Sequence, residues 1–335
     1  MSYGAKTIVR GAGPDVWFRF KGGWPMTHAH LDRRSVTLGL MAGAIAVPGV
    51  ARAQMHEPAK AIPVDQVPDA VLAASADASN RVTVPVMING RGPFPFMVDT
   101  GSTRTVVSDA LAAQLRLPVG ENLLIKAATG PAETNSVRVA SLSVGSLHLA
   151  NLRAPVLQRV NMGSLGILGL DAVSNQKLVM DFRKNQMLLT KSTQRGEDPF
   201  AITVQARSKY GQLLLVDCDV EGMPLYVILD TGSEGTIGNM TMRATLARYR
   251  QANEVEVISV TGDSVSAPVG ILPQLDVGHV RVMNQPIAYA DLYTFSQFGL
   301  HDKPAMLLGM NTLRHFARVS IDFPAREVRF LLENT

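Results

Sequence analysis

The sequence is nearly free of cysteine, because Cys218 is the only one in 335 residues. A single cysteine excludes an intramolecular disulfide, so the folded chain has to be stabilised by apolar cores. Cys218 lies in an alternating run that predicts a strand, and we interpret it as a packing residue rather than a nucleophile. With 46% apolar side chains, the chain can build one large domain or two modest ones.

Patterns for metals and nucleotides are missing too. The Gly-rich run 163–169 lacks the helix start and the lysine of a phosphate-binding loop. Five histidines follow residue 53, and none has the spacing of metal ligands: His56, His148, His279, His301 and His315. We therefore expect no metal and no cofactor.

A surplus of positive charge is also missing once the N-terminal segment is set aside. The formal net charge is +4, but residues 1–53 hold seven basic and two acidic side chains. The remaining 25 basic and 26 acidic side chains give a net of −1. Electrostatic attraction to phosphate groups loses its support, so we expect no nucleic-acid partner.

Residues 1–53 contain the pattern of an export signal. Arg33 and Arg34 precede the apolar stretch Leu38–Val50, which is too short to span a bilayer, and Ala51-Arg52-Ala53 gives a small-x-small cleavage pattern. The paired arginines resemble a twin-arginine signal. We predict cleavage after Ala53, a periplasmic or secreted protein, and no stable membrane anchor afterwards. The alternative is a buried helix that begins with the two arginines.

Two further expectations concern the N-terminal part. Residues 1–25 are unusual ahead of a signal, so we predict that translation starts at Met26; Trp17 and Trp24 both precede it. Residues 54–80 are rich in Ala, Pro, Asp and Ser, which predicts a flexible leader. A short piece of this leader is alternatively a strand or plug laid against the body.

The rest of the chain is an internal duplication around two copies of Asp-Thr-Gly-Ser, at Asp99–Ser102 and Asp230–Ser233. Each copy follows a predicted β-hairpin that delivers the Asp at the end of its second strand. The predicted strands and turns are Arg81–Ile88, Asn89-Gly90 and Pro93–Val98 in the first hairpin, and Leu213–Val220, Glu221-Gly222 and Pro224–Leu229 in the second.

The correspondence continues after the two motifs. The matching pairs are the helix caps Ser108 and Asn239, the hairpins at Thr129-Gly130 and Thr261-Gly262, Ile167-Leu168-Gly169 and Leu307-Leu308-Gly309, and Asp181 and Asp322. We interpret Asp181 and Asp322 as structural or surface residues, because basic side chains follow each. The sequence thus predicts two mainly β lobes, 81–192 and 199–334, each with a short helix and joined by a polar linker.

In these residues the chain resembles the aspartic proteases, specifically the retropepsin-like group. The resemblance covers residues 81–334 and rests on the apolar strand, Asp-Thr-Gly-Ser, a later Thr (Thr105, Thr236), a flap-like hairpin and an apolar-apolar-Gly element in both halves. It implies an acid-protease fold, in which two fused retropepsin-like β-barrel lobes are related by a pseudo-twofold axis. It also implies that Asp99 and Asp230 form one catalytic dyad.

The resemblance implies roles for the neighbours of the two aspartates. Thr100 and Thr231 would hydrogen-bond across the lobe junction. Gly101 and Gly232 would let backbone N–H groups approach the carboxylates, and Ser102 and Ser233 would donate to the outer carboxylate oxygens. The hairpins with Thr129, Gly130, Thr261 and Gly262 are candidate flaps. No Tyr lies between Ser102 and Ser208, which favours two flaps over the single flap tyrosine of pepsin-like enzymes.

These residues predict an exported aspartic-type endopeptidase, a hydrolase that acts on polypeptides with an activated water. One alternative is a non-catalytic peptide-binding or scaffold protein that retains the fold. Another is that each copy pairs with its twin in a second molecule. Because the linker is short, we expect the intramolecular pair and a monomer.

Overall fold

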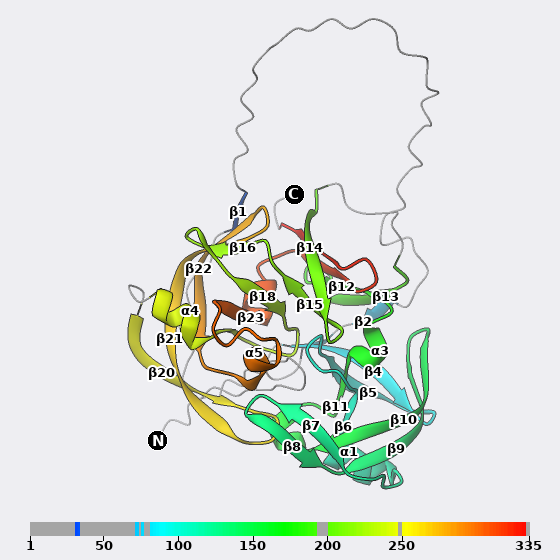
Figure 1. Cartoon of the computed structure of the whole chain (residues 1–335). Coiled ribbons are helices and arrows are strands. Elements are labelled where there is room, and N and C mark those ends of the chain that lie inside the picture. Colours follow the sequence, from blue (N-terminus) through cyan, green and yellow to red (C-terminus); the bar gives the residue numbers. More distant parts are fainter. Residues whose placement is uncertain are drawn as a thin grey trace, which may run out of the picture.

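The computed structural model describes residues 31–33, 71–73, 75–76, 81–192, 200–246 and 250–332. The expected start at Met26 and the cleavage site after Ala53 lie outside these ranges. The described chain is mainly β, with short helices, and Figure 1 shows two strand-rich lobes side by side. The predicted mainly β, two-lobe fold is therefore confirmed.

The first lobe is a closed β-barrel. Its sheet runs in the order β3-β4-β5-β11-β6-β10-β9, and a further pairing of β4 with β9 closes six of these strands into a ring. A separate hairpin, β7–β8, projects from it. The bounds are β3 (Ser75–Ala76), β4 (Val82–Ile88), β5 (Arg91–Val98), β6 (Val106–Ser108), β7 (Leu123–Ala127), β8 (Gly130–Thr134), β9 (Ser136–Val144), β10 (Leu147–Leu157), β11 (Gly166–Leu168), α1 (Asp109–Leu115), α2 (Arg159–Met162) and α3 (Leu170–Val173).

The second lobe repeats this strand order. Its sheet runs β17-β16-β21-β22-β19-β23-β18-β15, and β20 pairs with β21 as β7 pairs with β8. The bounds are β15 (Gln212–Leu215), β16 (Cys218–Val220), β17 (Met223–Pro224), β18 (Tyr226–Leu229), β19 (Thr236–Gly238), β20 (Arg250–Ile258), β21 (Ser264–Val277), β22 (Val280–Tyr289), β23 (Ala305–Leu308), α4 (Met240–Thr245), α5 (Tyr293–Gln297) and α6 (Met310–Leu313). The duplication seen in the sequence is thus a duplication of topology.

A shared six-stranded sheet joins the lobes, in the order β14-β25-β24-β12-β13-β2. Its central strands, one from each lobe, pair antiparallel, with Val179 opposite Ser320. Asp181 accepts hydrogen bonds from the Arg318 side chain (2.9 Å from Nη2) and from the Lys184 backbone (2.9 Å), as its structural interpretation implies. The bounds are β2 (Val71–Ala73), β12 (Lys177–Asp181), β13 (Gln186–Thr190), β14 (Ile202–Lys209), β24 (Arg318–Asp322) and β25 (Glu327–Leu331).

Three of the described strands come from upstream of residue 81. Strand β1 (Leu31–Arg33), from the expected export signal, pairs antiparallel with the start of β22. Strands β2 and β3 come from the expected leader. Strand β2 pairs with β13, and β3 pairs with β4. In the second lobe the single strand β14 makes both equivalent pairings, with β25 and with β15. The sheets of the first lobe therefore extend upstream of the predicted boundary, and residues 71–73 and 75–76 form strands, as in the strand alternative for the leader.

Local sequence accounts for the matching hairpins and helices. Asn89 (φ 50°), Gly90 (71°), Glu221 (49°) and Gly222 (83°) all have the positive φ that a two-residue hairpin turn requires. The predicted caps also form: Ser108 Oγ accepts from Leu111 N at 3.1 Å, and Asn239 Oδ1 accepts from Met242 N at 2.9 Å. These bonds satisfy backbone donors that the first helical turn leaves free.

One predicted strand is broken. The run Leu213–Val220 forms β15 and β16 with a gap at Val216 and Asp217, because the chain changes partners there: β15 pairs with β14 and β18, whereas Asp217 O accepts from Gly278 N at 2.6 Å and β16 pairs with β21. Cys218 is buried on β16, and burial raises the pKa of its thiol. The predicted helix after Asn239 ends at Thr245, and Tyr249 lies outside the described residues.

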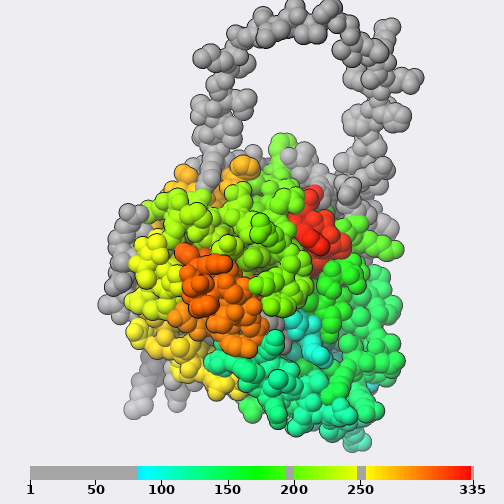
Figure 2. Space-filling model, viewed as in Figure 1, coloured from blue at the N-terminus to red at the C-terminus, as the bar shows by residue number. Residues whose placement is uncertain are grey.

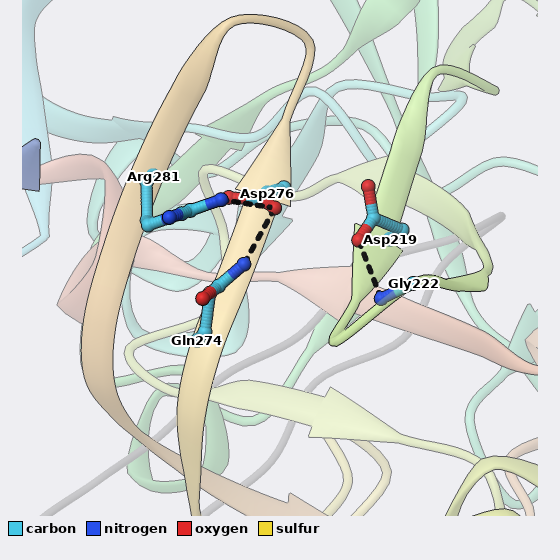
Figure 3. Close-up of polar contacts among 5 residues, drawn as sticks. All are labelled: Asp219, Gly222, Gln274, Asp276 and Arg281. Atoms are coloured by element: carbon cyan, nitrogen blue, oxygen red, sulfur yellow. Dashed lines mark hydrogen bonds and ion pairs between the residues drawn. The ribbon is translucent and has the colours of Figure 1, made fainter. Parts of the chain in front are cut away.

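An ion pair between a half-buried arginine and a buried aspartate joins the strands of the β21–β22 hairpin in the second lobe (Figure 3). Arg281 Nε lies 2.9 Å from Asp276 Oδ1, and Gln274 Nε2 donates to Asp276 Oδ2 at 2.8 Å. Asp276 is only 1% exposed. Asp219, whose Oδ1 accepts from Gly222 N, stands opposite Asp276 in the β16–β21 register.

Candidate active site

The two Asp-Thr-Gly-Ser loops begin where β5 and β18 end, and one strand supports each loop from behind. Asp99 N donates to Leu168 O and Asp230 N donates to Leu308 O, both at 3.1 Å. The chain passes too closely there for a side chain: an ideal Cβ at Gly309 would lie 2.2 Å from the Gly235 carbonyl oxygen. Glycine is thus required for the close approach that holds the loop.

The threonines of the two loops hydrogen-bond reciprocally across the lobe junction. Thr100 N donates to Thr231 Oγ1 at 3.0 Å, and Thr231 N donates to Thr100 Oγ1 at 3.2 Å. Each hydroxyl also donates to the opposite strand, Thr100 Oγ1 to Leu229 O at 3.1 Å and Thr231 Oγ1 to Val98 O at 3.0 Å. Both loops belong to one chain, so no second molecule is needed to bring them together.

One glycine of the second loop lies close to both carboxylates at this junction. An ideal Cβ on Gly232 would stand 2.5 Å from Asp99 Cγ and 2.6 Å from both Asp99 oxygens. The same Gly232 donates its backbone N–H to Asp230 Oδ1 at 3.0 Å. Asp99 and Asp230 are 1% and 0% exposed. A residue of the second loop is therefore in contact with both carboxylates, in a buried setting.

Backbone N–H groups orient both carboxylates in the same way. In each loop the Gly and Ser that follow donate to the Asp Oδ1. The bonds are Gly101 N (2.8 Å) and Ser102 N (3.2 Å) to Asp99, and Gly232 N (3.0 Å) and Ser233 N (3.0 Å) to Asp230. Such donors stabilise a negative charge on the carboxylate that they face.

The serine hydroxyls differ from the expectation. Ser102 Oγ donates to Arg104 O at 2.8 Å, and Ser233 Oγ donates to Gly235 O at 2.5 Å. A hydroxyl has one proton to donate, and here that proton closes the loop. The predicted donation from these hydroxyls to the outer carboxylate oxygens is corrected accordingly: the seryl residues reach the aspartates through backbone N–H.

Sequence reasoning missed two residues that hold the loops from outside. Asp171 accepts from Thr105 N at 2.9 Å and from Thr105 Oγ1 at 2.7 Å, and Asn311 Oδ1 accepts from Thr236 Oγ1 at 2.9 Å. Although part of Asp171 is exposed, desolvation raises the pKa of its carboxyl, outweighing the hydrogen bonds from Thr105. Both residues lie two positions after the glycine of the apolar-apolar-Gly element. This shared position in the duplication could have identified them from the sequence.

A third missed residue, Gln212, connects the lobes beneath the site. It is fully buried at the start of β15, and its Nε2 donates to the carbonyl oxygen of Gly101. No motif identified this residue, because the contact spans 111 positions of sequence.

The candidate flaps are hairpins whose tips meet. Thr129, in the β7–β8 turn, donates from Oγ1 to Asp263 Oδ2 at 3.2 Å, and Thr261 Oγ1 donates to the same oxygen at 2.8 Å. Gly130 (φ 137°) and Gly262 (φ 97°) supply the positive φ of the two turns. Asp263, the position that links the tips, was not predicted.

Each tip also packs into the opposite lobe. Ala128 joins an apolar cluster of second-lobe residues, and its carbonyl accepts from Tyr293 N at 2.9 Å. Val260, 1% exposed, joins an otherwise first-lobe cluster that includes Met97 and Ile125. Figure 2 shows the first hairpin against the orange segment that contains α5. Each flap tip is therefore exchanged between the lobes, in the sense that it packs against the lobe to which it does not belong.

Truncating one tip should loosen this exchange. We expect Val260→Ala to weaken the packing of the tip against the first lobe by about 1.5 kcal/mol, because it removes two methyl-sized groups from an apolar cluster. Hydrogen exchange at residues 255–266 should then become about tenfold faster. Val265→Ala, a partly buried change on the same hairpin, is the control; equal exchange in the two variants would contradict this packing of the tip.

The crossed threonines give a second prediction. Thr231→Val should destabilise the chain by about 1–3 kcal/mol, because Thr100 N and Val98 O lose a buried partner. Thr231→Ser keeps the hydroxyl and should recover most of the loss. Urea unfolding of the three proteins measures the difference, and a Val variant as stable as the parent would show that these bonds contribute nothing.

Comparison with known families agrees with this geometry. A family model described as aspartyl protease matches residues 84–172 and 216–312, more than half of the chain. Each match contains one Asp-Thr-Gly-Ser loop and falls within one lobe. The chain therefore belongs to the aspartyl protease family, and the resemblance seen in the sequence is confirmed. No curated protein sequence matches the chain.

The described ranges contain neither a metal-binding cluster nor a helix suited to span a membrane. No cluster of three or more His, Cys, Asp or Glu side chains suited to a metal ion occurs there. Nor does any helix in these ranges reach the length and apolar character needed to cross a bilayer.

Proposed function

We propose that this chain is an aspartic endopeptidase whose single active site contains Asp99 and Asp230. The observation that carries the proposal is the contact of Gly232 with both carboxylates, held by the crossed threonines. Family membership supports a protease of this class. The proposed substrate is a polypeptide segment in extended form.

The chemistry follows from the closeness of the two acids. Two adjacent buried carboxyl groups do not both ionise, so the pair retains one proton. The ionised carboxylate would take a proton from a water molecule while the protonated one polarises the scissile carbonyl. The water oxygen then attacks the carbonyl carbon and gives a tetrahedral intermediate without a covalent enzyme intermediate. The two protonation steps belong to the pair rather than to either residue.

The flap tips would form the roof of this site. With each tip packed against the opposite lobe, backbone groups of both hairpins would pair with an extended peptide. Because the carboxylates are buried, the tips would have to separate to admit a substrate.

The test is proteolysis of an unbiased peptide mixture by the purified chain, with and without a pepstatin-type inhibitor. We expect inhibitor-sensitive cleavage at internal bonds. Peptide binding that the inhibitor displaces, without any cleavage, would contradict the proposal and indicate a non-catalytic binding protein.

We further propose that the protein is exported, by the twin-arginine route, to the periplasm or beyond, and acts there as a monomer. The support is the Arg33-Arg34 pair, the short apolar stretch after it and the small-x-small pattern that ends at Ala53. N-terminal sequencing of the protein recovered from its native compartment should begin at Gln54. Retention of residues before 54, or tryptophan fluorescence from Trp17 and Trp24, would contradict the cleavage.

A further inference from the structure

Two cavities occupy equivalent positions in the two lobes, and both lobes build each of them. The first, about 720 Å³, lies between β8, the end of β10 and α2, and is completed by Val260 and Thr261 of the opposite flap tip. The second, about 400 Å³, lies beside α5 and is completed by Ala128 and Thr129 of the first flap tip. The tip residues are the same pair of positions in the duplication. Cavities that are completed by a flap tip of the opposite lobe are suited to hold side chains of a bound peptide.

The two cavities differ in charge as well as in size. Two carboxylic residues, Asp109 and Glu133, line the first, and none of its described lining residues is basic. The second has one carboxylic residue, Asp291. The Asp109 carboxylate is anchored, because its Oδ1 accepts from Arg159 N at 2.9 Å. The first cavity is therefore both larger and more negative.

The first cavity also has an apolar floor. Ile125, Val156, Leu157 and Val260 line it together with the polar residues. A long basic side chain needs this combination, because its methylene stem packs on apolar surface while its charged end reaches polar groups. A short or purely apolar side chain would not reach the carboxylates of the lining with a positive charge.

We propose, on the basis of the peptidase function above, that the first cavity selects an arginine or lysine of the polypeptide substrate and that Glu133 determines this selection. Glu133 is exposed on β8, so its carboxylate keeps its hydration while the cavity is empty. The second cavity accepts a smaller side chain and discriminates less by charge. The substrate is thus a segment that carries a basic side chain for the first cavity.

The test compares two peptides that differ only in Arg or Gln at the position preferred in the library. We expect the parent protein to prefer Arg, and Glu133→Gln to lower the Arg-to-Gln ratio of kcat/KM about two- to fivefold, the range for an exposed ion pair. Glu133→Lys should abolish or reverse the preference. Glu254→Gln, an exposed glutamate on β20 that lines neither cavity, should leave the ratio unchanged.

Two outcomes separate this inference from the function on which it rests. If peptides are cleaved without a basic preference, or if Glu133→Lys keeps the preference, the inference fails and the peptidase function stands. If nothing is cleaved, the peptidase function fails. The selectivity of the first cavity is then tested by the affinities of the labelled Arg and Gln peptides, measured by fluorescence anisotropy. Equal affinities would overturn the inference of a basic pocket. The Arg preference should also weaken with added salt.

Discussion

Asp99→Asn and Asp230→Asn are each expected to lower kcat/KM on peptides by a factor of about 10²–10⁴, the range that a positioned acid–base group contributes. Each change removes one carboxyl from a pair that has to share a proton. The fold should survive, since an amide oxygen can still accept the backbone hydrogen bonds at Oδ1. Because the acids act as one unit, the double variant should lose little more than either single variant.

The matched control is Asp217→Asn, an exposed carboxylate in the gap between β15 and β16. It should retain parental activity and stability. A single dyad variant with near-parental turnover would contradict one shared site, because two independent sites would each survive the loss of the other.

The largest expected effect on stability is that of Arg281→Ala. Removing the guanidinium takes away the ion pair and two hydrogen bonds of the buried Asp276 carboxylate, which lies beside Gln274 (Figure 3). Loss of one partner from a fully buried pair costs about 3–5 kcal/mol, and the 31% exposure of the Arg281 side chain lowers the expected loss toward the bottom of that range. Urea unfolding should therefore show a much lower midpoint with an unchanged slope.

An exposed pair is the control for this prediction. Arg153 contacts Glu121 at 3.0 Å with side chains 39% and 80% exposed, so Arg153→Ala should cost no more than about 1 kcal/mol. The double variant Arg281→Met with Asp276→Leu should recover most of the lost stability, since an apolar pair needs no counter-charge. Equal losses for Arg281→Ala and Arg153→Ala would show that Asp276 is hydrated enough to do without its partner.

The sequence predicted those features that short-range chemistry specifies. The Asn-Gly and Glu-Gly turns, the Ser108 and Asn239 caps and the glycines behind each loop depend on contacts within the local backbone or on the need for a residue without a side chain. Because the chain carries these features twice, each half supported the interpretation of the other. The two-lobe β fold and the family were therefore within reach of the sequence.

The features that sequence reasoning missed depend on contacts between distant residues. The pairing of β12 with β24 and the Gln212 bond to Gly101 join segments more than a hundred positions apart. Strand β15 ends early because the chain changes strand partners at Asp217, a switch that alternation does not reveal. The serine hydroxyls were assigned to the wrong acceptor because the sequence does not show which oxygen of a tight loop lies nearer.

The exchange of flap tips connects these long-range contacts with the proposed function. Local pattern predicted both hairpins, but only the folded chain places Val260 among first-lobe residues and Ala128 among second-lobe residues. Each proposed side-chain pocket is consequently completed by the other lobe. A substitution at one tip should therefore alter selectivity on the opposite side of the dyad.

The most direct test of a single site built from both lobes is active-site titration with a pepstatin-type inhibitor, combined with the mass of the protein in solution. The account predicts a monomer that binds one inhibitor per chain and loses all activity at that ratio. A dimer that binds two inhibitors per pair of chains, and exchanges activity with chains carrying Asp230→Asn, would show that each loop pairs with its twin in another molecule.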